Sequence, residues 1–172
     1  MNRLGLLGLV SWVILISSLG FVPASQAQLT DEIVLVPLID VKFSGWEKKT
    51  GFPKIEKGQE GDKGWIEAQN IYQKGGSTLT AVIAEGGDVN KDLAAMRALP
   101  EYDNKVGFRK KIVIGGVQGV ESYDRGQKKG TLVLNVSNRF GIRLEAAPIE
   151  NNEVLKDFAN KMPLTKIWRL AQ

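Results

Sequence analysis

Five consecutive polar residues, Glu121 to Arg125, form the stretch whose side chains could do chemistry. They end an apolar run, so we expect them on a β-strand that enters a glycine-containing turn. Side chains alternate along a strand, which puts Glu121, Tyr123 and Arg125 on one face and Ser122 and Asp124 on the other. A carboxylate, a phenol and a guanidinium on one face could perform acid–base chemistry or bind an anion.

Arginines from neighbouring strands extend this possibility. Arg139 and Arg143, together with Arg125, could clamp a carboxylate or phosphate, and the Tyr123 ring could stack on a ligand. The alternative is a set of exposed cross-strand ion pairs, with Glu121 or Glu145 opposite an arginine. Each such pair contributes on the order of a few tenths of a kcal/mol. Both interpretations place these side chains on the sheet.

The composition excludes most familiar catalytic machinery. The chain of 172 residues has no cysteine and no histidine, which rules out Ser-His-Asp and Cys-His nucleophiles and zinc sites made of these ligands. Glu121 and Asp124, on opposite strand faces, cannot approach each other as paired acid–base carboxylates. We therefore assign no catalytic residue, metal or cofactor. A carboxylate- or tyrosine-based enzyme centred on Glu121–Arg125 is the alternative function.

Positive charge gathers at Arg109, Lys110 and Lys111. Lys and Arg number 23 and Asp and Glu 19, so the net charge is +4, an ordinary value for solubility. A solvated strand end explains this basic patch most simply. The alternative is contact with an anionic membrane or polysaccharide surface. Nucleic acid is not expected as a partner, because the chain has no aromatic-rich RNA-binding motif.

The N-terminus has the pattern of an export signal. Arg3 precedes an uncharged apolar run, and Ser25 and Ala27 occupy the small-residue positions of a signal-peptidase site. We expect a signal peptide over residues 1–27, cleavage after Ala27, and a single domain over 28–172 in the periplasm or secreted. An uncleaved membrane anchor is the alternative, because the run is nearly long enough to span a bilayer.

Hydrophobic periodicity predicts an α+β fold. Alternating apolar residues indicate strands over 108–114, 132–136 and 140–146, and a hairpin over 66–83; helical spacing indicates helices over 89–99, 153–162 and 164–171. Asp88 is the expected N-cap of the first helix. We expect a single antiparallel sheet of about five to seven strands, built from hairpins and a meander and covered by helices.

Other segments leave alternatives open. Pro37 interrupts the apolar run 33–39, which is expected to be a short strand or a helical turn. The polar, glycine-rich segment 51–64 is expected to be a loop with at most one edge strand. Trp46, Trp65 and Trp168 are interpreted as core anchors, and a hydrophobic groove lined by them is the alternative.

Several short motifs are similar to those of a loose class of small exported bacterial proteins. They are the Gly45-Trp46 start, the run Tyr72 to Gly76, the Arg139-Phe140 strand and the closing helix with Leu164 to Ile167. The order of elements also resembles that of the extrinsic oxygen-evolving subunit P family, in which helices cover a sheet. The resemblance implies an exported α+β protein and implies no activity.

Together these features favour a non-catalytic exported protein that binds a partner protein of the cell envelope or a small ligand. A shallow apolar patch rimmed by charge would favour this binding function. A deep pocket that holds a buried carboxylate beside Tyr123 would favour the enzyme instead.

Overall fold

The computed structural model of the protein describes residues 29–60, 63–86, 89–137 and 139–172. The predicted signal peptide and the predicted cap Asp88 lie outside these residues. The helices are α1 (Glu32–Ile39), α2 (Val89–Ala98), α3 (Glu153–Lys161) and α4 (Leu164–Leu170). The strands are β1 (Glu47–Lys48), β2 (Lys54–Glu60), β3 (Lys63–Lys74), β4 (Ser77–Gly86), β5 (Tyr102–Asp103), β6 (Gly107–Ile114), β7 (Val117–Asp124), β8 (Lys129–Val136) and β9 (Phe140–Ala147).

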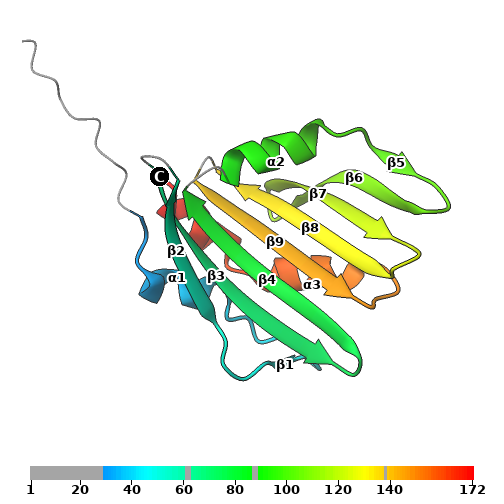
Figure 1. Cartoon of the computed structure of the whole chain (residues 1–172), viewed down its shortest axis with the longest axis horizontal. Helices are drawn as coiled ribbons and strands as arrows, with labels where there is room; N and C mark the ends of the chain where they lie inside the picture. Colours follow the sequence, from blue (N-terminus) through cyan, green and yellow to red (C-terminus); the bar gives the residue numbers. More distant parts are fainter. Residues whose placement is uncertain (1–28, 61–62, 87–88, 138) are drawn as a thin grey trace, which may run out of the picture.

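The nine strands described form one antiparallel sheet in the order β1-β3-β4-β9-β8-β7-β6-β5, with β2 also paired to β3 (Figure 1). The α+β class and the antiparallel sheet are confirmed. The prediction of about five to seven strands was too low. Two extra strands, β1 and β5, have two residues each and show no periodicity. The charged β2 forms because the twelve-residue β3 offers it a long ladder.

The predicted alternation of β9 is confirmed. Phe140, Ile142, Leu144 and Ala146 are at most 1% exposed, whereas Arg143 between them is exposed. The register aligns apolar residues across the sheet, so that Ile142 stands between Ile83 of β4 and Leu134 of β8. We call this side of the sheet the core face and the other side the open face.

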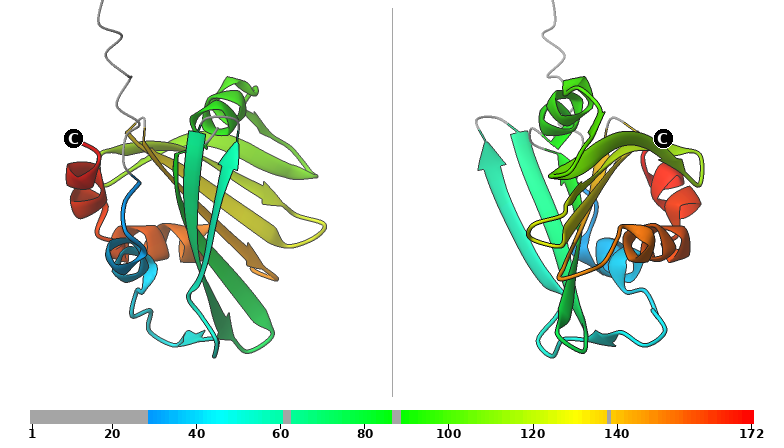
Figure 2. Two further views of the ribbon diagram at one scale, coloured as in Figure 1. Left: turned by 60° about the vertical axis from the view of Figure 1, so that its left-hand side comes forward. Right: turned by 90° about the vertical axis from the view of Figure 1, so that its right-hand side faces the viewer.

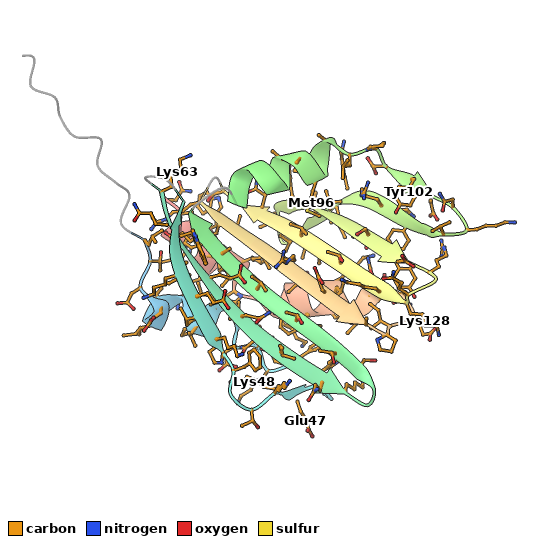
Figure 3. All side chains as sticks on the ribbon, in the orientation of Figure 1. Glu47, Lys48, Lys63, Met96, Tyr102 and Lys128 are labelled. Atoms are coloured by element: carbon orange, nitrogen blue, oxygen red, sulfur yellow. The ribbon has the colours of Figure 1, made fainter. Side chains whose placement is uncertain are left out.

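The helices α1, α3 and α4 cover the core face, and α2 lies over the open face (Figure 2). On the core face, α3 buries Leu155, Phe158 and Ala159, and Phe158 packs edge-to-face on Tyr72 of β3 at 5.0 Å. The helix α2 crosses one end of the open face, where its Met96 lies over the sheet (Figure 3). The predicted covering of the sheet by helices, the two C-terminal ones included, is confirmed.

The apolar run 33–39 belongs to a helix, α1, and not to a strand. Asp31 caps it by accepting a hydrogen bond from the Ile33 amide at 3.0 Å. Pro37 lies inside the helix and cannot donate to the Ile33 carbonyl four residues earlier. Ile33 is 76% exposed, so water reaches this first turn and the helix tolerates the proline.

A buried tyrosine fastens the end of α1 to the sheet. The Tyr72 hydroxyl donates to the Ile39 carbonyl at 2.7 Å and accepts from the Val41 amide at 3.0 Å. The Asn70 amide donates to the same carbonyl at 3.1 Å. Burial is the main cause that raises the pKa of Tyr72. These bonds satisfy backbone groups that the helix end leaves in the core.

Replacing Tyr72 by phenylalanine is expected to lower the free energy of unfolding by about 1–2 kcal/mol, because the buried Val41 amide loses its partner and the Ile39 carbonyl keeps only the Asn70 amide. The raised pKa favours the protonated phenol in the folded state, so the wild type loses stability as the pH rises above about 10. The phenylalanine variant should lose less stability over the same rise in pH. Urea denaturation at pH 7 and about pH 11 measures both effects, and an equal alkaline loss in the two proteins would contradict the assignment.

Candidate functional site

The predicted polar cluster splits between the core and the surface. Glu121 and Tyr123 point to the core face of β7, where each is only 6% exposed. The Tyr123 hydroxyl donates to the Ile149 carbonyl at 2.7 Å, and its ring stacks on Phe108 with centroids 5.9 Å apart. The ring and the hydroxyl are therefore both engaged within the fold.

The Glu121 carboxylate is paired with a cation of α3. Lys156 Nζ lies 3.4 Å from Glu121 Oε2 and 3.0 Å from Glu153 Oε1. Burial lowers the pKa of Lys156, but the hydrogen bonds and charges of Glu153 and Glu121 outweigh it and the pKa is raised. The lysine therefore stays charged and holds α3 against β7. This arrangement links two elements and offers no free base.

The other half of the cluster forms a turn. Asp124 accepts a hydrogen bond from the Gln127 amide at 2.8 Å. Arg125 lies beyond the strand, where it donates to Asp103 at 2.9 Å and to the Asn104 carbonyl at 3.0 Å. A hydrogen bond from Lys110 is the main cause that lowers the pKa of Asp103. The hydrogen bond and the charge of Arg125 lower it further. Arg125 therefore binds the neighbouring turn between β5 and β6.

The three predicted anion-binding arginines do not converge. Arg139, just before β9, donates to Glu85 at 2.5 Å. Arg143 projects from the middle of β9 onto the open face, 3.8 Å from Glu145. Arg125 lies at the far edge of the sheet. The structure therefore brings none of them together in a clamp, although Arg143 keeps an exposed guanidinium.

The basic patch is also divided by strand alternation. Arg109 and Lys111 lie on the open face, where Arg109 stacks on Tyr102 of β5 at 5.4 Å. Lys110 points to the other side and pairs with Asp103 at 2.7 Å. Lys111 Nζ lies 3.9 Å from a carboxylate oxygen of Glu101. Both lysines therefore have an acidic neighbour.

Because Lys110 and Lys111 each lie beside a carboxylate, we expect them to contribute little to contact with an anionic membrane. Exchanging Lys110 and Lys111 together for glutamine should change retention on vesicles containing anionic lipid by less than about twofold, because their charges are already offset. Co-sedimentation at low and high salt is the measurement, since true surface binding weakens as salt rises. A large, salt-sensitive loss in the double variant would instead support the anionic surface as a partner.

A hollow that the sequence reasoning did not assign lies where α4 meets the turn between β6 and β7. Its volume is about 240 Å³, and its walls are Gly115, Gly116, Val117, Leu164, Thr165 and Trp168. Leu164 and Val117 are almost buried, whereas Trp168 is 50% exposed. The walls combine apolar side chains with polar surface, and the indole offers one hydrogen-bond donor.

Local sequence explains the shape of this Trp168 hollow. Gly115 and Gly116 have φ angles of 57° and 81°, the left-handed values that a two-residue hairpin turn requires. The turn therefore places no side chain between itself and α4. On α4, Ile167 is fully buried, which turns the next residue, Trp168, toward the surface. Trp168 was predicted to be a core anchor; it is half-exposed because the helix directs its other apolar residues inward.

The described residues contain no cluster of three or more acidic residues that could hold a metal ion. None of their helices is both long and apolar enough to cross a membrane. Comparison of the chain with protein-family models, with curated proteins and with solved structures finds no match.

Proposed function

We propose that the protein is a non-catalytic binding module that holds a partner protein or a small ligand at the Trp168 hollow. The observation that carries the proposal is a half-exposed tryptophan beside a hollow of about 240 Å³ whose walls include Val117 and Leu164. Exposed aromatic side chains are costly to leave in water and are enriched at binding sites. The export part of the proposal, to the periplasm or the outside, rests on the sequence of residues 1–27.

The geometry favours binding over catalysis. An enzyme centred on Glu121–Arg125 needs a carboxylate or phenol that reaches substrate. Glu121 is almost buried and ion-paired with Lys156, and the Tyr123 hydroxyl is bound to a backbone carbonyl. These groups stabilise the packing of α3 on the sheet. The Trp168 hollow, by contrast, has walls that a ligand can contact.

The test is affinity capture of the tagged mature protein from the cell envelope, with three versions compared. Trp168→Ala should recover a partner at least tenfold less well than the wild type, because the main apolar wall is gone. The matched control is Tyr102→Ala, which removes a 39% exposed aromatic side chain of β5 that lies beside Arg109 on the open face and is not part of the hollow. Equal recovery by all three proteins would refute the hollow as the binding site.

A further inference from the structure

The Trp168 hollow adjoins the outer edge of β6, which the strands of the described residues cover only in part. β5 pairs with β6 over two residues only. Continuing that register would set Pro100 opposite Lys111, and proline has no N–H to donate to the ladder. The outward N–H of Lys111 is bound instead by the Glu101 carboxylate at 3.2 Å. The pairing of β6 on its outer side therefore ends at Lys111.

Beyond that point the outer backbone of β6 is open. In an antiparallel strand, alternate residues direct their N–H and C=O groups to opposite neighbours. Gly107 and Lys111 donate away from β7, so Val113 does so as well. Within the described part of the chain no strand pairs with Val113 on this side, and Val113 is 65% exposed. The backbone of β6 at Val113 is therefore available to pair with an added strand.

The open edge leads into the hollow. Val113 precedes Gly115, the first residue of the hollow wall, by two positions, a step of about 7 Å along a strand. A segment that lies along β6 at Val113 can therefore place a side chain against Trp168. The edge provides backbone hydrogen bonds, and the hollow provides an apolar anchor point.

The charge beside the hollow indicates what this segment contains. Arg169 follows Trp168 on the exposed side of α4, and Lys166 lies one helical turn before Arg169. Neither forms an ion pair with any of the residues described. Two unneutralised cations, three residues apart on one helix, favour a partner that carries acidic side chains next to its apolar residue.

On the basis of the proposed function, we propose that the partner is an extended protein segment, apolar in its middle and acidic at its ends. It adds to the outer edge of β6 at Val113 and inserts one apolar side chain into the Trp168 hollow. This is recognition by strand addition, in which backbone bonds supply affinity and a pocket supplies specificity.

The test uses fluorescein-labelled eight-residue peptides with glutamates at both ends and alternating valine and leucine in the middle. Two further versions carry N-methyl groups on one or the other set of alternate residues. In strand addition only one set of N–H groups faces β6. One methylated peptide should therefore bind at least tenfold more weakly, and the other within about twofold of the parent. Amide exchange of Val113 should slow at least tenfold in the complex.

Protein variants test the charge and anchor steps. Lys166→Gln with Arg169→Gln should weaken peptide binding about tenfold, whereas Lys42→Gln with Lys49→Gln, which also removes two exposed cations, should not. Failure of the parent peptide to bind would overturn the inference, as would equal binding of both methylated peptides. A dimer that protects Val113 without peptide would also overturn it and make a second copy the occupant. Each of these results leaves the capture experiment with Trp168→Ala to decide the proposed function separately.

Discussion

Replacing Arg139 by methionine is expected to lower the free energy of unfolding by about 3–5 kcal/mol, because it leaves a buried carboxylate without its cation. Glu85 is 1% exposed, and Arg139 Nε lies 2.5 Å from its Oε1. The same guanidinium donates to the Leu170 carbonyl at 3.2 Å and to Thr30 Oγ1 at 3.3 Å. The variant thus loses a connection among β4, β9, α4 and the segment before α1.

Two further variants separate the ion pair from general damage. Arg143→Met removes an exposed arginine four residues later, within β9, and should change stability by less than about 0.5 kcal/mol. Adding Glu85→Gln to Arg139→Met should recover part of the loss, because the unpaired buried charge disappears. Urea denaturation followed by circular dichroism measures all three. A loss below about 1 kcal/mol in Arg139→Met would show that water solvates Glu85 in the folded state.

The role of Arg139 has a consequence for the hollow. Its bond to Leu170 holds the end of α4, the helix that carries Trp168. The sequence reasoning proposed Arg139 as a ligand-binding residue, and the structure places it within a packed junction instead. A loss of binding in an Arg139 variant would therefore need to be compared with its loss of stability before it could be interpreted as loss of contact.

Periodicity predicted the strands because one face of the sheet is buried. Phe140, Ile142 and Leu144 are buried, the charged Arg143 and Glu145 that follow Ile142 and Leu144 are more exposed, and this pattern is visible in a single sequence. β5 and β1 could not be predicted, because two residues have no period. α1 could not be distinguished from a strand, since its apolar run is short and contains Pro37.

The candidate site was less predictable, because it depends on contacts between distant segments. Glu85 and Arg139 are separated by 54 positions, and each ends or precedes a strand whose register the sequence does not give. The Trp168 hollow likewise needs the turn at Gly115 beside α4. The sequence contains the Gly115-Gly116 turn and a tryptophan between Lys166 and Arg169. Nothing in the sequence indicates that these two segments lie side by side.

Replacing Gly119 by alanine is expected to lower the free energy of unfolding by about 3 kcal/mol, because the centre of the sheet has no room for a methyl group. A Cβ built at Gly119 would lie 2.3 Å from the Val133 carbonyl oxygen and 2.7 Å from Leu134 Cδ2. Leu134 could change rotamer, but the carbonyl belongs to the neighbouring strand β8 and can move only with the ladder.

The matched control is Gly76→Ala in the turn between β3 and β4, where a Cβ would have no atom within 4 Å and the backbone is not left-handed. This variant should stay within about 0.5 kcal/mol of the wild type. Adding Leu134→Ala to Gly119→Ala should give no recovery, because the contact with the Val133 carbonyl persists and a cavity is added. Recovery in that double variant would mean that the side chain of Leu134, rather than the spacing of β7 and β8, requires glycine at position 119.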